Sequence, residues 1–248
     1  MTRAWLLLRS AVLWTASILH FCVAVPAVLV LAQVFGWRRM EPLVRLGSRN
    51  IVRLAGARVV VHVAPGYDPK LTGFFASNHV NIFDPFVLYG TVPRNFRGLE
   101  LESHFRIPVY GWLMKGFGNV PVPDARTPSG LKRTYRLAGE AIERGTCLLV
   151  FPEGSRTLDG RVGPFEDGVF RMAIQLKVPI TPLSIVNSFR WQNKRTKLLR
   201  PATIHVHVHE PIHVDGLTRK DLDALRERVR AIVTAPVHAA LEDRKSVV

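Results

Sequence analysis

The sequence predicts an α/β fold: a mostly parallel central sheet flanked by helices, with an N-terminal membrane-associated helix or helical hairpin. Three observations support this prediction. After residue 56, short apolar runs alternate with amphipathic stretches, the pattern of a parallel sheet covered by helices. Before it lies an uncharged apolar segment of membrane-spanning length. Polar residues follow two of the apolar runs, and ligands bind outside the strand ends of such sheets.

The apolar segment 11–37 contains no formally charged residue and could cross a hydrocarbon core of about 30 Å as a helix. Pro26 complicates a straight span because it removes one backbone hydrogen bond and kinks a helix. The segment can be a kinked single span, or two shorter helices that enter one leaflet and return. A cleaved signal peptide with Arg3 and Arg9 as its basic end fits less well, because the segment exceeds a signal core and lacks a small-residue cleavage site.

The segment after it is basic, and Glu41 is the only acid that opposes its arginines. Such a cluster beside a membrane segment is typical of the cytoplasmic side, so we expect an amphipathic helix on anionic headgroups. The alternative is a solvated basic face. We therefore divide the chain into an anchoring and interfacial region, 1–55, and an α/β domain, 56–248. The arginines are Arg38, Arg39, Arg45, Arg49, Arg53 and Arg58.

The domain begins with apolar strands at 57–63 and 73–77. Asp84 and Pro85 then mark a helix start, with Asp84 as the N-cap and Pro85 at the first helical position. The other predicted elements are a helix at 129–144, a strand at 146–151, a helix at 167–177, a strand at 180–186 and an amphipathic helix at 218–244 interrupted at Pro236.

Between residues 203 and 214 apolar and polar residues alternate, which predicts a strand with one buried face. His205, His207 and His209 share the other face. Three histidines could point at one metal ion, but a flat strand spaces them about 7 Å apart, too wide for a tetrahedral ion. We therefore expect a solvent-facing surface and no metal.

The charge balance implies an anionic partner, since 34 Lys and Arg residues stand against 19 Asp and Glu residues, a net charge of +15. The partner can be nucleic acid, an anionic membrane surface or a phosphorylated substrate. The sequence has no interleaved aromatic stacking motif, zinc spacing or helix-turn-helix, so no nucleic acid is expected. Cys22 and Cys147 read as small buried apolar residues.

His79 lies on the turn between the strand at 73–77 and the helix that begins at Asp84. A histidine and an aspartate delivered by one short loop can form a base with its own orienting carboxylate. In the plain alternative, Asp84 only caps the helix and His79 is an ordinary loop residue.

A second polar group, Glu153, Gly154, Ser155 and Arg156, follows the strand at 146–151 and should emerge at the same edge of the sheet. A guanidinium beside exposed backbone N–H groups suits a phosphate or a polar headgroup. The alternative is a surface turn with a weak ion pair. Ser155 is not expected to be a nucleophile, because Glu153 stands where the nucleophile turn needs glycine.

The two groups together, NHxxxxD and about seventy residues later FPEGSR, resemble the glycerolipid acyltransferase family, of the 1-acyl-sn-glycerol-3-phosphate acyltransferase type. The resemblance covers roughly residues 60–215, the size of one catalytic domain. It implies acyl transfer from acyl-CoA or acyl carrier protein to the hydroxyl of a lysophospholipid, 1-acyl-sn-glycerol-3-phosphate, giving phosphatidic acid. It implies no other cofactor, and a place at the cytoplasmic face of the inner membrane.

In this family resemblance, His79 is the general base, Asp84 orients it, and no acyl-enzyme forms. Arg156 would bind the acceptor's phosphate, beside Gly154 and Ser155, and Glu153 would bind a hydroxyl or Arg126.

The sequence departs from the family's pattern at two positions. Asp124 falls where the second block usually carries arginine, which leaves Arg126 as the nearby candidate for the phosphate. Glu166 stands where lysine is common. Because both departures remove positive charge, a different acceptor stays open, such as a lyso-ornithine lipid or a zwitterionic lysophospholipid. A non-catalytic protein that binds membranes or nucleic acid is the alternative of another class.

Overall fold

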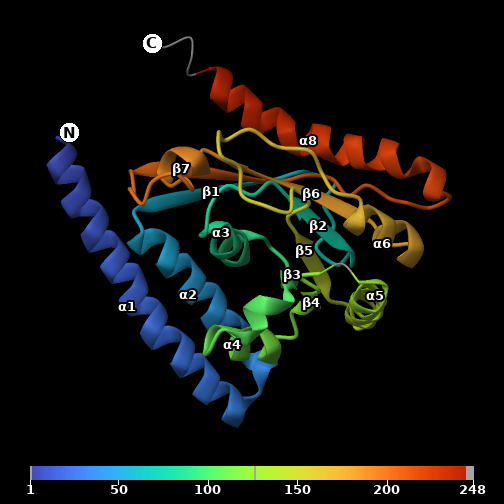
Figure 1. Ribbon diagram of the computed structural model, residues 1–248, viewed down its shortest axis with the longest axis horizontal. Helices are drawn as coiled ribbons and strands as arrows, with labels where there is room; N and C mark the ends of the chain where they lie inside the picture. Colours follow the sequence, from blue (N-terminus) through green and yellow to red (C-terminus); the bar gives the residue numbers. More distant parts are fainter. Residues whose placement is uncertain (1, 126, 244–248) are drawn as a thin grey trace.

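The computed structural model describes residues 2–125 and 127–243. Within them, seven strands form one sheet in the order β1-β7-β6-β2-β5-β3-β4. The β6–β7 pair is antiparallel and the other neighbours run parallel, so the predicted mostly parallel α/β fold is confirmed (Figure 1). The strands are β1 (Ala57–Val63), β2 (Phe74–Ser77), β3 (Phe96–Leu101), β4 (Val120–Val122), β5 (Cys147–Val150), β6 (Ile180–Val186) and β7 (Ala202–Val208).

Helices pack on both faces of the sheet. One hydrophobic core lies between the sheet and α5, α6 and α8, and a second lies between the sheet and α2 and α3. Helix α1 runs along α2 on the outside (Figure 1). The helices are α1 (Arg3–Phe35), η1 (Trp37–Met40), α2 (Glu41–Leu54), α3 (Asp84–Thr91), η2 (Glu102–Arg106), α4 (Tyr110–Gly116), α5 (Pro128–Glu143), α6 (Gly168–Leu176), α7 (Ser188–Trp191), η3 (Arg219–Asp221) and α8 (Leu222–Glu242).

Strand β2 lies near the middle of the sheet, between β6 and β5. Phe74 and Ala76 pack into the core under α5, α6 and α8, while Phe75 packs into the core under α2 and α3. Because both faces are covered, the strand is apolar on consecutive residues rather than on alternate ones. The segment that follows the carboxyl end of β2 is therefore attached to a strand that is packed on both faces.

Helix α1 is continuous from Arg3 to Phe35 with Pro26 inside it, so the interpretation as two shorter apolar helices is wrong. Its inner side contacts the body along most of its length. Arg9 Nη1 donates to Leu199 O at 2.7 Å. Further along, Val25, Val28 and Ala32 pack against Leu113 and Phe117.

The outer side of α1 is apolar and exposed. A helix of this length and hydropathy could cross a membrane, although 17% of its most apolar window is buried inside the protein. Cys22 lies on this exposed side, which corrects the prediction that it is buried, while Cys147 is buried as predicted. The exposed large apolar residues of α1 are Trp5, Leu7, Leu8, Val12, Ile18, Leu19, Val23, Val30, Val34 and Phe35.

A close contact joins η1, directly after α1, to the end of α4. The Trp37 ring packs edge-on against Phe117, with ring centroids 5.1 Å apart. A Cβ on Gly116 would lie 2.0 Å from the Trp37 ring, so only glycine leaves room for this contact. The turn after α1 is thus fixed to the α/β body.

Two of the arginines in the basic cluster are used inside the protein. Arg45 Nη2 donates to Val92 O at 2.7 Å and Arg49 Nε donates to Gly90 O at 2.6 Å. The carbonyls at the end of α3 lack helical partners, and these guanidinium groups satisfy them. Helix α2 is therefore docked on α3, and its buried apolar residues face the core rather than a lipid surface. The division of the chain at residue 55 stays a prediction.

Several boundaries differ from the sequence prediction. Pro236 lies within α8 and does not interrupt it. Strand β7 ends at Val208 rather than at residue 214. Asp84 is the first residue of α3 and its carboxylate does not cap the helix, because it faces back into the preceding loop. Strands β3 and β4 were not predicted, since both are short and mix apolar residues with Gly, Pro or charged ones.

His205 and His207 of β7, and His209 just after it, lie half-buried at the surface, and His62 of β1 joins them. The His62 and His207 rings stack with centroids 4.6 Å apart, and His62 Nε2 lies 3.0 Å from His205 Nδ1. Stacked rings do not converge on one point. Among the described residues, no group of three or more His, Cys, Asp or Glu could hold a metal ion.

This stack makes stability depend on pH. Burial, with repulsion from the neighbouring histidines, lowers the pKa of His207 from 6.5 to about 4. The folded state holds His207 neutral. Its contribution to the free energy of unfolding is therefore full above pH 6.5 and is lost as the pH falls toward 4. We expect the native melting temperature to fall over this interval, and to fall less in His207→Gln. If the melting temperatures of the native protein and of His207→Gln changed equally with pH, His207 would not cause the pH dependence.

Candidate active site

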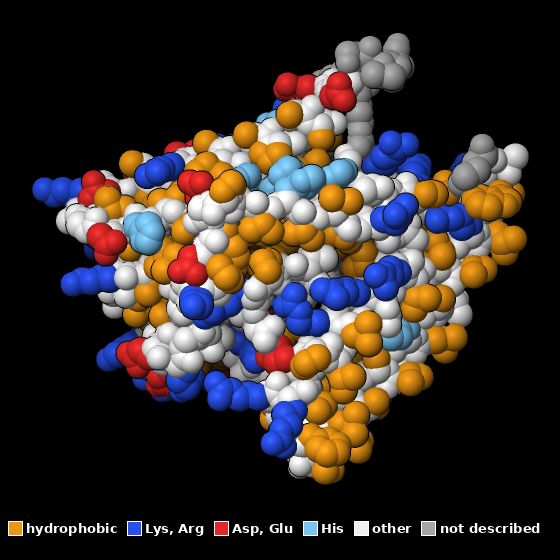
Figure 2. All heavy atoms as spheres, turned by 180° about the vertical axis from the view of Figure 1, so that it is seen from behind, with side chains coloured by type: hydrophobic (Ala, Val, Ile, Leu, Met, Phe, Trp, Pro, Cys, Tyr) orange, Lys and Arg blue, Asp and Glu red, His pale blue; other side chains and the backbone are white. Residues whose placement is uncertain are grey.

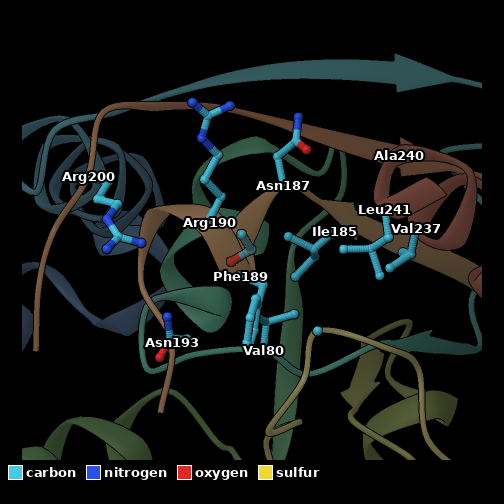
Figure 3. Close-up of a pocket in the computed structure, with 12 residues that line it drawn as sticks. Val80, Ile185, Asn187, Phe189, Arg190, Asn193, Arg200, Val237, Ala240 and Leu241 are labelled. Carbon is cyan, nitrogen blue, oxygen red and sulfur yellow. The ribbon is translucent and has the colours of Figure 1, made fainter. Parts of the chain in front are cut away.

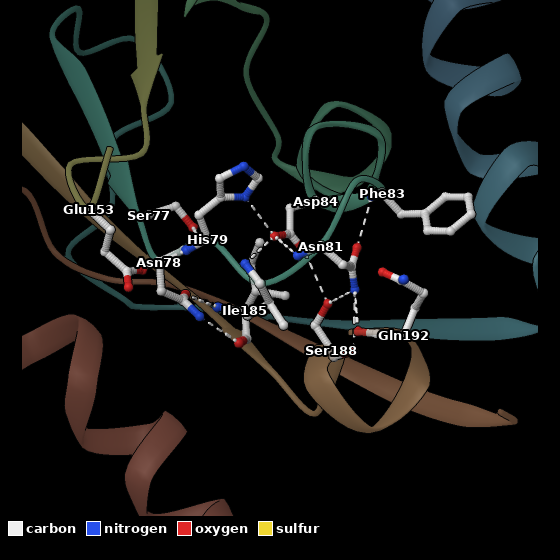
Figure 4. A network of polar contacts seen from close by, with 11 residues as sticks. Ser77, Asn78, His79, Asn81, Phe83, Asp84, Glu153, Ile185, Ser188 and Gln192 are labelled. Atoms are coloured by element: carbon white, nitrogen blue, oxygen red, sulfur yellow. Dashed lines mark hydrogen bonds and ion pairs between the residues drawn. The ribbon is translucent and has the colours of Figure 1, made fainter. Parts of the chain in front are cut away.

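Three chain segments meet at the carboxyl ends of the adjacent parallel strands β2, β5 and β6. The segment 78–84 follows β2, the segment 151–157 follows β5, and the segment 187–192 follows β6. Figure 4 shows polar side chains from all three segments directed toward one another. This is the edge at which the sequence places the site.

His79 and Asp84 form a hydrogen-bonded pair. Nδ1 of His79 lies 2.9 Å from Asp84 Oδ2, and the aspartate is fully buried. The same oxygen accepts the backbone N–H groups of Val80 at 2.5 Å and Asn81 at 2.8 Å. A carboxylate that accepts these hydrogens fixes the proton of the neutral imidazole on Nδ1, so Nε2 keeps its lone pair. The pair can therefore accept a proton at Nε2.

The imidazole is held from a second side by Phe151, whose ring stacks on it with centroids 4.1 Å apart and planes 18° apart. The His79 side chain remains 20% exposed, so a substrate can reach it. Stacking together with the Asp84 contact fixes both the plane and the rotation of the base.

The other oxygen of Asp84 accepts a hydrogen bond from Ser188 Oγ at 3.0 Å. Asn81 Nδ2 donates to that hydroxyl at 2.7 Å, so the hydroxyl proton is directed at Asp84. Ser188 was not predicted from the sequence. A signal was present, because a polar Asn-Ser pair follows the apolar strand β6 just as Asn-His follows β2.

Asn78 ties the site to β6. Its Nδ2 donates to Ile185 O at 3.0 Å and its Oδ1 accepts from Ile185 N at 2.7 Å. The side chain thus pairs with a strand backbone as another strand would, and it is 1% exposed. His79, the next residue, is fixed relative to β6 as a result.

Glu153 lies close to His79 but contacts its backbone. Oε1 accepts from His79 N at 2.7 Å, and Oε2 accepts from Gly163 N at 2.8 Å. Burial raises the pKa of Glu153, while the two N–H groups act in the opposite direction. Both oxygens are thus engaged by the protein, and contact with an acceptor hydroxyl or with Arg126 stays a prediction.

The rest of the second group forms a turn. Gly154 has a φ of +66° and donates its N–H to Phe151 O at 3.0 Å, a conformation that favours glycine. Ser155 is exposed. Arg156 is half-buried, and its guanidinium makes no hydrogen bond or ion pair with another described residue, so it is available to an anion. Arg126 lies outside the described residues.

The two departures from the family's pattern have defined surroundings. Asp124 accepts from Ser103 N at 2.9 Å and from Ser103 Oγ at 2.6 Å, and these bonds lower the pKa of Asp124. It therefore holds the start of η2. Glu166 Oε1 lies 3.0 Å from where a Cβ on Gly154 would stand, so a second acid adjoins the turn before Arg156.

A cavity of about 200 Å³ lies behind the dyad loop. Val80 and Ser188 line it, but neither His79 nor Arg156 does. Figure 3 shows Phe189 directed toward Val80, with apolar side chains of α8 on the opposite side. The cavity is therefore separate from the exposed imidazole, although it shares Ser188 with the support of Asp84.

Comparisons with known proteins identify the family of the chain. A family model described as Acyltransferase matches residues 47–186. The chloroplastic 1-acyl-sn-glycerol-3-phosphate acyltransferase BAT2 of Brassica napus is 29% identical over 140 residues, which are 56% of this chain and 40% of that protein. The human 1-acyl-sn-glycerol-3-phosphate acyltransferase alpha is 27% identical over 188 residues, 76% of this chain and 66% of its own.

The crystal structure of the 1-acyl-sn-glycerophosphate acyltransferase PlsC from Thermotoga maritima has the same fold, with a TM-score of 0.81 and 20% identity. The matched region covers 96% of this chain and 97% of the PlsC chain. The chain spans about two fifths of the length of the first plant relatives that it matches. The matched segment, which is more than half of the chain, holds both the dyad and the FPEGSR turn, and the chain therefore belongs to the Acyltransferase family.

Proposed function

We propose that the protein is an O-acyltransferase that moves an acyl group from acyl-CoA or acyl carrier protein to the hydroxyl of 1-acyl-sn-glycerol-3-phosphate, giving phosphatidic acid. The observation that carries the proposal is the buried Asp84 paired with the exposed imidazole of His79. The names of its relatives supply the acceptor. Arg156, which has no partner among the described residues, is available to the acceptor's phosphate.

In the proposed reaction, Nε2 of His79 takes the proton of the acceptor hydroxyl as its oxygen attacks the thioester carbon. Asp84 stabilises the imidazolium that forms. The oxyanion then collapses, the carbon–sulfur bond breaks, and His79 returns the proton to the leaving thiolate. No protein nucleophile is required, because the acceptor alcohol fills that role.

The apolar outer side of α1 supports membrane association. We further propose that the membrane is the inner membrane and that the protein lies at its cytoplasmic face. Since the inner side of α1 contacts the body from Arg9 to Ala32, a crossing helix would have to leave these contacts. We therefore propose that α1 lies within one leaflet, parallel to the membrane plane, with its exposed residues in the acyl chains.

Turnover tests the proposal. The purified protein should release free thiol from acyl-CoA only when 1-acyl-sn-glycerol-3-phosphate is added, and phosphatidic acid should appear in equal amount. Thiol release without acceptor would indicate a hydrolase, and no release with any donor would refute the proposed activity.

The acids at positions 124 and 166 support a second acceptor class. A cationic or zwitterionic headgroup, as in a lyso-ornithine lipid or a zwitterionic lysophospholipid, would suit a site that has lost two positive charges. A panel of lysolipids with one donor decides between the two, because the chemistry at His79 is the same for both.

We expect Ser188→Ala to lower kcat about tenfold with little change in KM. The variant removes one hydrogen bond to a buried carboxylate, which is worth roughly 1.5 kcal/mol. Steady-state kinetics on the lysolipid acceptor measure the effect. Ser129→Ala, which removes an exposed hydroxyl on α5, serves as the control. Native kcat in Ser188→Ala would contradict the role of Ser188 in positioning Asp84.

A further inference from the structure

The connection between β6 and β7 carries a concentrated positive charge that the proposed reaction does not use. Residues 187–201 contain five bases and no acid. All five side chains are exposed, and none makes a hydrogen bond or ion pair with another described residue. We call this segment the basic connection, and its bases are Arg190, Lys194, Arg195, Lys197 and Arg200.

The basic connection is fixed against the first half of α1 through its backbone. Trp14 Nε1 donates to Lys197 O at 2.6 Å, and Arg9 Nη1 donates to Leu199 O at 2.7 Å. Leu199 N in turn donates to Ser10 Oγ at 3.0 Å. The lysine and arginine side chains are left free, because only backbone atoms of the connection are engaged in these contacts.

The exposed apolar side of α1 lies beside this charge. Trp5, Leu8 and Val12, from the same turns of α1, are 50%, 67% and 59% exposed. In Figure 2 the apolar side chains of α1 form one edge of the molecule, and blue side chains gather next to its N-terminal half. An apolar strip bordered by free bases matches an anionic bilayer, with acyl chains under the strip and phosphates under the bases.

We propose that the basic connection binds the headgroups of anionic phospholipids, as an electrostatic contact beside the apolar contact of α1. This inference rests on the proposed membrane association of α1. It assigns the anionic surface to the basic connection rather than to Arg45 and Arg49 of α2, which are bonded to α3. Because the connection begins at the carboxyl end of β6, it holds the sheet edge that carries His79 near the headgroups.

The test is binding of the full chain to sedimenting vesicles of phosphatidylcholine, with and without phosphatidylglycerol. The variant K194Q/R195Q/K197Q removes three of the five bases and keeps the backbone atoms that contact α1. We expect its affinity for mixed vesicles to fall about a hundredfold at low salt, and its affinity for pure phosphatidylcholine to stay native. High salt should remove the difference between the native and variant proteins.

The matched control, R219Q/K220Q/R228Q, removes three exposed bases around the start of α8, which Figure 1 places away from α1. An equal loss in this control would overturn the proposal, because net charge alone would explain it. An equal loss on neutral vesicles, or a loss of duplex DNA binding with unchanged vesicle binding, would overturn it as well. No acyl transfer is needed in this measurement, so failure of the proposed reaction is a separate result.

Discussion

His79→Ala is expected to lower kcat for acyl transfer about 10³-fold, because the substitution removes the group that takes the acceptor's proton. The fold should persist, since the side chain is partly exposed and Asp84 keeps three other hydrogen-bond donors. Thiol release in the presence of lysolipid gives the rate, and thermal denaturation shows whether the variant is folded.

His104→Ala is the matched control. His104 is also paired with a carboxylate, Glu100, at 2.8 Å, but its side chain is 43% exposed and it lies on η2, which follows β3 rather than β2. Native activity is expected in this control. If His79→Ala kept the native rate while folded, proton transfer to Nε2 would have no part in the reaction.

Asp84→Ala is expected to damage both activity and stability. Its carboxylate is fully buried and accepts from four groups, two of them backbone N–H groups that would lose their partner. We expect a loss of roughly 3 kcal/mol in the free energy of unfolding, together with a fall in kcat of about 10³-fold.

Asp84→Asn separates these two effects. It keeps one acceptor oxygen for the N–H groups, so chemical denaturation should show a smaller loss of stability. It removes the negative charge that stabilises the imidazolium, so the loss of kcat should stay large. A variant with the native kcat would show that Asp84 shapes the loop without assisting the base.

Much of the site could be predicted because its chemistry is local in sequence. His79 and Asp84 are five residues apart on one turn, and a buried strand precedes them. The sequence also predicts that Glu153 lies at the same edge of the sheet as His79, because Glu153 follows a buried strand as well. Its partners were not predictable, since the bonds to His79 N and Gly163 N depend on how two loops approach each other.

Contacts between segments that are distant in the sequence could not be predicted from residue patterns. Ser188 touches Asp84 across 104 residues, and the pairing of β6 beside β2 decides that contact. Two arginines of the basic cluster show the same effect, because Arg45 and Arg49 suit headgroups by sequence but donate to the carbonyls of Val92 and Gly90 in the structure. Charge and periodicity indicate what a residue can do, while packing selects its partner.

The side chain of Asn78 has a consequence for the order in which the protein becomes active. It closes a contact with Ile185 over 107 residues, and loop closure of this length costs entropy that only later packing recovers. A chain synthesised only as far as β5 already contains the whole NHxxxxD segment, yet it lacks β6 and Ser188. Catalytic competence therefore requires that β6 has entered the sheet beside β2.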